Sequence, residues 1–211
     1  MSNPWHFKPE NINNYAKLAG VRRTMKYCSD CGTEVVKKIP IDDDRLRYVC
    51  PQCEITHYQN PKVVVGCLPT SGKQVLLCRR AIEPRIGFWT IPAGFMENGE
   101  TMLEGALRET REEAAAKVKD ETLYRLFDIP HINQVYVLYF GELDGDFGIG
   151  PETLESRLFS EDEIPWSELA FPIVTDVLTE YFEDRKTGEF PIRVSIPSPL
   201  WAKHVGWKLP M

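Results

Sequence analysis

Four cysteines constrain the N-terminal part of this chain more than any other feature. They form two C-x2-C pairs that are 18 residues apart: Cys28, Cys31, Cys50 and Cys53. The stretch around them, residues 25–60, contains too few apolar residues for an independent core and therefore needs a cross-link such as a bound metal ion. Two tight turns that each present two thiolates fit one tetrahedral ion, and four thiolates leave no coordination position open. We therefore predict a small β domain with a structural zinc ion; the alternative is a redox dithiol pair or simple buried cysteines.

The remaining composition narrows the class of protein. Cys67 and Cys78 lie singly in strand-like segments and are interpreted as small core residues. A formal net charge of -6 argues against nucleic acid as a partner. The longest nearly uncharged apolar run, residues 63–69, is far shorter than a membrane span of about 20 residues, so no membrane partner is expected. Residues 1–24 lack the pattern of a secretory signal, which makes them an N-terminal extension and predicts a cytoplasmic protein.

A β-rich pattern begins at residue 61 and predicts a second domain over residues 61–187, followed by a C-terminal tail over residues 188–211. Strand-like segments at 62–69, 74–80 and 87–94 precede a helix at 101–117, after which come strands near 123–129, 134–140 and 154–159 and a helix at 173–184. The first helix has a well-marked start, because Thr101 followed by Glu104 makes a capping box. Its apolar face is expected to consist of Leu103, Ala106, Leu107, Thr110 and Ala114.

Three glutamates of the first helix share one face. Glu109, Glu112 and Glu113 are three or four residues apart and point together, about 120° from the apolar face. Such crowded carboxylates repel one another unless a hard cation such as Mg2+ or Mn2+ gathers them. Arg108, four residues before Glu112, is placed to fix their orientation. A glycine turn leads into the helix N-terminus, where free amides favour phosphate, so the segment predicts a pyrophosphate-and-metal site.

A run of glutamates is more commonly a solvated helix face, and the spacing is what argues against that alternative here. Residues 94–116 closely resemble the Nudix box, G-x5-E-x7-R-E-U-x-E-E-x-G-U, where U is a bulky aliphatic residue. Six fixed positions match: Gly94, Glu100, Arg108, Glu109, Glu112 and Glu113. Thr110, Ala115 and Ala116 depart from the pattern at the first aliphatic, final glycine and last aliphatic positions. The resemblance extends over residues 62–185 and implies the Nudix α/β/α sandwich with a mixed sheet, preceded by the zinc-ribbon β domain.

This resemblance assigns roles to the box residues. Glu109 and Glu113 become the principal ligands of the catalytic Mg2+ or Mn2+, with Glu112 completing the cluster. The carbonyl of Gly94 is a plausible additional ligand. Arg108 joins the catalytic set because it orients the carboxylates.

Residues outside the carboxylate helix complete the expected site. A general base or further metal ligand often comes from a downstream loop in this family, and Glu155 is the candidate, with Glu152 as the runner-up. An exposed strand residue is the alternative for Glu155. Phe88 and Trp89 precede the box, where one can stack on a base while the other packs inside. Glu100 is expected, with the glycine of the turn, to contribute to cofactor or substrate binding.

The resemblance implies hydrolysis of a dinucleotide pyrophosphate to two monophosphates. A zinc ribbon joined to such a domain is similar both to NADH pyrophosphatases and to plant-type FAD or ADP-ribose pyrophosphatases. Residues 164–174, IPWSELAFPIV, lack the S-Q-P-W-P-F-P-x-S motif of the first group, so FAD and ADP-ribose are the expected substrates and NADH or NAD the alternative. A catalytically inactive zinc-ribbon binding module is the alternative of another class, and a homodimer is expected from the family.

Overall fold

The computed structural model describes residues 24–197, which divide into two compact units at Pro61 and Lys62. Nearly all of the expected N-terminal extension and the last part of the expected tail, residues 198–211, lie outside the described residues. No helix within residues 24–197 is long and apolar enough to cross a membrane.

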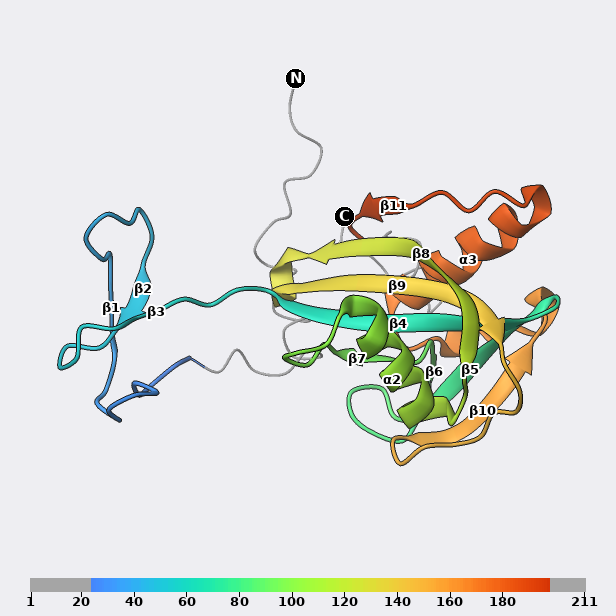
Figure 1. The fold of residues 1–211 in the computed structure, drawn as a ribbon, viewed down its shortest axis with the longest axis horizontal. Coiled ribbons are helices and arrows are strands. Elements are labelled where there is room, and N and C mark those ends of the chain that lie inside the picture. Colours follow the sequence, from blue (N-terminus) through green and yellow to red (C-terminus); the bar gives the residue numbers. More distant parts are fainter. Residues whose placement is uncertain (1–23, 198–211) are drawn as a thin grey trace, which may run out of the picture. The chain divides into compact units, whose positions relative to one another are not determined.

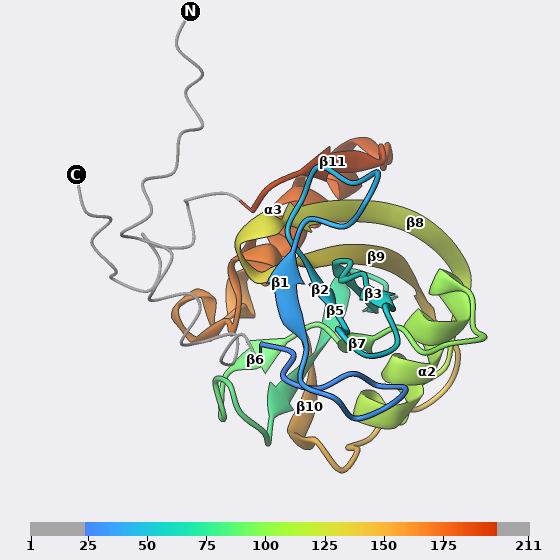
Figure 2. The same cartoon turned by 90° about the vertical axis from the view of Figure 1, so that its left-hand side faces the viewer.

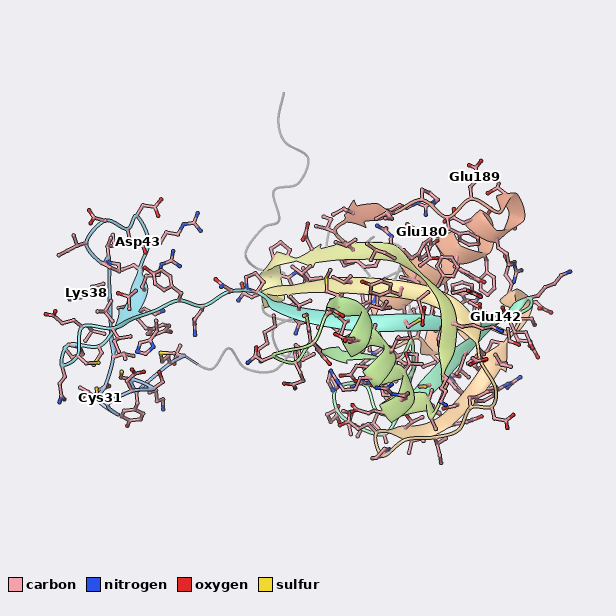
Figure 3. The ribbon with its side chains drawn as sticks, in the orientation of Figure 1. Cys31, Lys38, Asp43, Glu142, Glu180 and Glu189 are labelled. Atoms are coloured by element: carbon pink, nitrogen blue, oxygen red, sulfur yellow. The ribbon has the colours of Figure 1, made fainter. Side chains whose placement is uncertain are left out.

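The first unit is a three-stranded antiparallel sheet, drawn in blue and cyan in Figure 1. It contains β1 (Val36–Lys38), β2 (Arg47–Val49) and β3 (Thr56–His57), in that order. The side chains of this unit, marked in Figure 3 by Cys31, Lys38 and Asp43, include several large exposed hydrophobics, and within residues 24–61 the buried apolar residues are Cys28, Val49 and Cys50. So small a core cannot stabilise a sheet without the structural zinc ion that the sequence predicts.

The second unit is built on an eight-stranded mixed sheet. Its main path has the order β10-β5-β4-β9-β8-β11, with β6 paired to β5 and β7 paired to β4. Two of its pairings are parallel, β4 with β9 and β11 with β8, and the others are antiparallel. The strands are β4 (Lys62–Ser71), β5 (Gln74–Arg80), β6 (Trp89–Thr90), β7 (Ala93–Phe95), β8 (Val118–Ile129), β9 (Gln134–Leu143), β10 (Thr153–Phe159) and β11 (Arg193–Ser195).

Helices α2 (Met102–Ala114) and α3 (Pro172–Thr187) cover opposite faces of this sheet, as Figures 1 and 2 show from two directions. Alternation along β4 divides its side chains between the two layers. Val65 packs with Ala106 of α2, whereas Leu68 joins the larger cluster that contains Leu178 of α3. Short 3-10 turns, Pro130–Ile132, Glu161–Glu163 and Trp166–Glu168, complete the connections. This is the predicted α/β/α sandwich with a mixed sheet.

The sheet continues beyond residue 187, where the second domain was expected to end. β11 pairs with β8, and two charged groups hold it there. Asp184 of α3 accepts two hydrogen bonds of 2.6 Å from Arg193 and one of 2.7 Å from the Tyr124 hydroxyl. Arg125 of β8 is paired with a glutamate of α3 and also donates to the Ser195 hydroxyl at 3.2 Å. The first part of the expected tail is therefore an edge strand.

Candidate functional site

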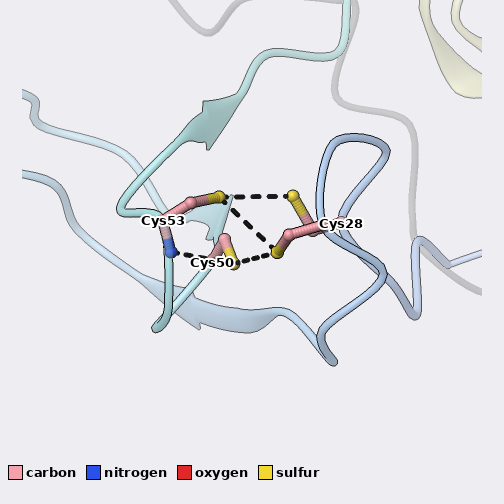
Figure 4. Close-up of side chains that lie close together, drawn as sticks. Cys28, Cys50 and Cys53 are labelled. Atoms are coloured by element: carbon pink, nitrogen blue, oxygen red, sulfur yellow. Dashed lines mark hydrogen bonds between the residues drawn. The ribbon is translucent and has the colours of Figure 1, made fainter.

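The four cysteines of the first unit converge on one point (Figure 4). Their Sγ atoms all lie within 4.8 Å of one another. The separations are 3.6 Å for Cys28 and Cys53, 3.4 Å for Cys31 and Cys50, and 3.7 Å for Cys31 and Cys53. Four Zn–S bonds of about 2.3 Å in a tetrahedron place sulfurs about 3.8 Å apart, so the cluster has the size that zinc requires.

Both cysteine pairs lie in turns of the same construction. The amide of Gly32 donates to the carbonyl of Cys28 at 3.0 Å, and the amide of Glu54 donates to the carbonyl of Cys50 at 3.0 Å. Gly32 and Glu54 both have left-handed backbones, with φ of 72° and 60°. The turns thus direct two thiols each toward the shared centre, and all six cysteines of the chain are free thiols. This geometry fits a closed metal site rather than a disulfide framework.

Helix α2 begins at the predicted capping box. The amide of Glu104 donates to the Thr101 hydroxyl at 3.2 Å, and the amide of Thr101 donates to the Glu104 carboxylate at 2.8 Å. The buried side of the helix includes Ala106, Thr110 and Ala114, as the periodicity predicts. Thr110 fits a position where the box has an aliphatic residue because its hydroxyl donates to the Ala106 carbonyl at 2.8 Å.

Arg108 uses its whole guanidinium to hold the box together. It donates two hydrogen bonds to Glu100, of 3.0 and 2.8 Å, one to Glu109 at 2.7 Å and one to Glu112 at 3.0 Å. A further bond of 3.1 Å reaches the carbonyl of Phe95, the last residue of β7. Hydrogen bonds from Arg108 lower the pKa of Glu100 to about 2. Glu100 is therefore an anchor for Arg108, and Arg108 in turn orients two of the three helix carboxylates.

The turn before the helix has to come close to the carboxylates. A Cβ atom at Gly94 would overlap the Glu109 carboxylate, so only glycine allows the backbone of β7 to lie against this side chain. The amide of Ala93, the residue before Gly94, donates to the Glu113 carboxylate at 3.4 Å. The glycine turn and the carboxylate helix consequently form one site, as the box pattern predicts.

The three helix carboxylates differ in burial. The side chain of Glu109 is 12% exposed, whereas that of Glu112 is 58% exposed. Burial raises the pKa of Glu113 to about 8, and the nearby charge of Glu109 adds to this increase. Burial also raises the pKa of Glu109, although Arg108 acts in the opposite direction. Their desolvated, mutually repelling charges are the condition under which a bound cation stabilises a site.

The carboxylates are close but not gathered as tightly as the cysteines. In the described part of the chain, the cysteine cluster is the one set of three or more possible ligands whose atoms lie within 4.8 Å of one another. Arg108 draws the carboxylates of Glu109 and Glu112 to its own amino groups, while Glu113 bonds to a backbone amide. Chelation by all three would require these side chains to rotate.

The loop after β9 closes the C-terminal end of α2. The amide of Gly148 donates to the carbonyl of Ala114 at 2.7 Å, and that of Gly150 donates to the carbonyl of Glu113 at 2.9 Å. A Cβ atom at Gly150 would overlap the carbonyl of Glu112. The helix ends at Ala115, which adopts the left-handed conformation with φ of 48° at the position where the box has glycine. The glycine-rich loop therefore borders the carboxylate site from the helix end.

The structure does not bring Glu155 to this site. Its neighbour Ser156 lies 3.6 Å from the thiol of Cys78, which packs with Ala114 on the α2 face of the sheet. Adjacent strand residues point to opposite faces, so Glu155 faces away from the carboxylate helix and pairs instead with Arg79 at 3.7 Å. The register shifts between Thr153 and Glu155, so these two residues point to opposite faces although they are two residues apart. The spacing in the sequence does not predict this change of face.

Glu152, the runner-up, is the acidic residue of this segment that lies beside the site. Its charge contributes to the raised pKa of Glu109 and of Glu113, in both cases after burial. Its backbone carbonyl accepts a hydrogen bond of 2.8 Å from the amide of Ala81, which fixes the end of β10 against the end of β5.

The two aromatic candidates have different surroundings. Trp89 is buried, with its ring edge-to-face against Phe159 at a centroid separation of 4.8 Å, and belongs to the core on the α3 side. Phe88 is partly exposed, and the guanidinium of Arg85 lies 3.8 Å from the centre of its ring. Of the two, only Phe88 retains surface for contact with a base.

Comparisons with known proteins agree with this architecture. The family model described as NUDIX domain matches residues 60–179, and a zinc-ribbon model described as Nudix N-terminal matches residues 26–59. The NAD-capped RNA hydrolases NudC of Shigella flexneri and of Escherichia coli (strain K12 / DH10B) are each 29% identical over 153 residues, covering 71% of this chain and 57% of the relative. The chain therefore spans little more than half the length of these curated relatives.

Solved structures give the same assignment. The crystal structure of a NUDIX hydrolase from Nitrosomonas europaea is 53% identical, covers 82% of this chain and 98% of that chain, and has a TM-score of 0.79. An ADP-ribose pyrophosphatase from Streptococcus suis 89-1591 shares the fold, with 21% identity, a TM-score of 0.54, and coverage of 64% of this chain and 99% of that chain. The NUDIX match spans more than half of the residues and includes every box position. This chain therefore belongs to the Nudix hydrolase family and carries that family's zinc ribbon ahead of its NUDIX domain.

Proposed function

We propose that this chain is a metal-dependent pyrophosphohydrolase that acts on FAD, ADP-ribose or both. The oxygen of a water molecule forms a bond to one phosphorus while the bridging P–O bond breaks, giving AMP together with FMN or ribose phosphate. One observation carries the proposal: Glu113 is a half-buried carboxylate whose hydrogen-bond partner within residues 24–197 is a single backbone amide, that of Ala93. A desolvated carboxylate charge that no cationic group hydrogen-bonds is costly unless the site binds a cation.

The donor set fits a hard divalent ion. Glu109 and Glu113 are the principal ligands we propose, with Glu112 and the carbonyl of Gly94 as further oxygen ligands, and such ligands suit Mg2+ or Mn2+. When bound, this ion neutralises the diphosphate and lowers the pKa of a coordinated water. Arg108 holds Glu109 and Glu112 beside Glu113 through the bonds described above, and rotation of these side chains would complete the ligand set around the ion.

Glu152 replaces Glu155 as the general base in this proposal. It is exposed to solvent, and its charge acts on both Glu109 and Glu113, whereas Glu155 lies on the other face of the sheet. An exposed carboxylate beside the ligands is placed to accept a proton from the attacking water.

The substrate class is supported by two different observations. The segment 164–174 lacks the motif of NADH pyrophosphatases, which favours FAD and ADP-ribose. NAD or NADH is the second candidate, because the curated relatives with 29% identity are NAD-capped RNA hydrolases. All of these molecules join two halves through a diphosphate, so the same carboxylate site serves each of them. We propose a homodimer as well, which size-exclusion chromatography with light scattering will test.

Product analysis tests this function. The full chain, loaded with zinc and supplied with Mg2+ or Mn2+, is incubated with FAD, ADP-ribose, NADH and ATP at equal concentrations, and the products are separated by chromatography. Release of AMP with FMN or ribose phosphate is the expected result. A clear preference for NADH would select the second candidate, and no turnover of any substrate would leave the zinc-ribbon binding module as the function.

A further inference from the structure

Arg80 lies at the end of β5, beside the carboxylate site, and is not among the site residues that the sequence predicts. It is paired with Thr153 in the register of β5 and β10, and the amide of the next residue, Ala81, donates to the carbonyl of Glu152 at 2.8 Å. Its positive charge acts against the burial that raises the pKa of Glu113 to about 8. Arg80 therefore borders the same space as Glu113 and Glu152.

The guanidinium of Arg80 is fixed by neutral groups. Its Nε atom donates to the carbonyl of Pro84 at 2.8 Å, and its central carbon lies 5.2 Å from the centre of the Phe171 ring at the start of α3. Arg80 is only partly exposed, and its guanidinium makes no ion pair and no other hydrogen bond with any residue that the structure describes. Both terminal amino groups are thus available to a ligand.

The neighbouring arginine shows that this arrangement is not a general property of the strand end. Arg79 donates to the carbonyl of Gly87 at 2.9 Å and is paired with Glu155 at 3.7 Å on the opposite face of the sheet. Arg108 likewise satisfies its guanidinium with carboxylates. Arg80 alone of these three stands beside acidic side chains and bonds to none of them.

An arginine held in this way has the chemistry of a phosphate site. Its planar fork of terminal N–H groups matches two oxygens of one phosphate, and ring stacking together with the Nε bond reduces the entropy lost when a ligand binds. The Pro84 carbonyl and the Phe171 ring are neutral, so the terminal amino groups of Arg80 can still form charge-assisted hydrogen bonds with a diphosphate. We propose that Arg80 is a substrate-binding residue that holds the diphosphate through its terminal amino groups, opposite the carboxylate helix. This inference rests on the proposed pyrophosphohydrolase function.

Binding of a non-hydrolysable diphosphate tests Arg80 without requiring turnover. The probe is adenosine 5′-(α,β-methylene)diphosphate with Mg2+, measured by calorimetry on the full chain, with KM and kcat for the best substrate determined in parallel. Loss of a charge-assisted bidentate contact should weaken binding of the probe and raise KM by about 10- to 100-fold in Arg80→Ala. Arg80→Lys, which keeps the charge but not the fork, should recover part of the loss. Arg79→Ala is the matched control. Its affinity for the probe and its KM should stay within about 3-fold of the parent values, a smaller change than the loss of one hydrogen bond would cause.

The outcomes separate this contact from the proposed function. Unchanged binding and KM in a folded Arg80→Ala variant, or an equal loss in Arg79→Ala, would overturn the role of Arg80 even if the parent hydrolyses ADP-ribose. Failure of the parent to bind the probe would overturn it too. Arg80-dependent binding by a parent that hydrolyses none of the substrates would refute the proposed function and leave the diphosphate contact standing.

Discussion

Replacement of Ala115 by glycine should stabilise the second unit. Ala115 ends helix α2 in the left-handed conformation, with φ of 48° and ψ of 28°, and its amide donates to the carbonyl of Arg111 at 3.0 Å. This position normally carries glycine in the Nudix box, because a Cβ atom crowds the following carbonyl in this conformation. Ala115 is exposed, so little packing is lost with its methyl group.

The size of the effect follows from two opposing terms. Removal of the Cβ atom relieves about 1–2 kcal/mol of left-handed strain. The greater freedom of glycine in the unfolded chain costs about 0.5–1 kcal/mol. At the middle of both ranges the net gain in the free energy of unfolding is about 0.75 kcal/mol, equivalent to a rise in Tm of about 1.5–3 °C for a chain of this size.

Thermal and urea unfolding, followed by far-ultraviolet circular dichroism at fixed zinc concentration, will measure this change. Ala116→Gly is the control, because Ala116 is 1% exposed and has no positive φ, so the same substitution should destabilise by about 1 kcal/mol or more. A Tm for Ala115→Gly at or below that of the parent would refute the strain at the helix end.

Four further predictions concern the two metal sites and the edge strand. Glu113→Gln should lower turnover by orders of magnitude and leave Tm nearly unchanged, because it removes a ligand charge and little volume; steady-state kinetics will show whether activity survives. Glu152→Gln should lower kcat at least about 100-fold, within the usual contribution of a general base, while Glu155→Gln should retain nearly full kcat, and the reverse ranking would restore the sequence-based choice. Cys50→Ser should release zinc, measured by atomic absorption, and destabilise the protein, so a stable variant with a full zinc content would contradict the structural site. Hydrogen bonds from Arg193 hold the pKa of Asp184 below its usual range. The ionised Asp184 therefore stabilises the fold at neutral pH, and this stabilisation is lost as pH falls through the lowered pKa. Asp184→Asn should lower the free energy of unfolding in urea by about 1.5–3 kcal/mol at pH 7 and by progressively less below about pH 4.

Local patterns in the sequence were sufficient for much of the fold. The capping box at Thr101, the apolar face of α2 and the β5 segment all follow from interactions between residues close in the chain, and each is confirmed. The edge strand β11 is different, because three residues carry too little periodicity to predict a strand. Its position depends on Asp184 and Arg125, which are distant from each other in the sequence.

The same distinction explains the candidate site. The grouping of Glu109, Glu112 and Glu113 is a property of helical spacing and could be read directly, as could the close approach of Gly94. The predicted approach of Glu155 to this site was wrong because the register shift in β10 reverses the faces of the strand. The sequence shows Arg80 only as the second residue of an Arg-Arg pair. Only the folded chain shows that Arg79 is paired with Glu155 whereas the guanidinium of Arg80 has no acidic partner.

Isotope transfer from water tests most directly whether the carboxylate helix is a metal-dependent hydrolytic centre. The zinc-loaded protein is incubated with ADP-ribose in H2(18)O, with and without Mg2+, and the AMP and ribose phosphate are analysed by mass spectrometry. We expect one 18O atom in one of the two monophosphates, incorporated only when the divalent ion is present and lost in Glu113→Gln. Label transfer that is undiminished in Glu113→Gln or without Mg2+, or no cleavage of ADP-ribose, FAD or NADH by the folded protein, would contradict it.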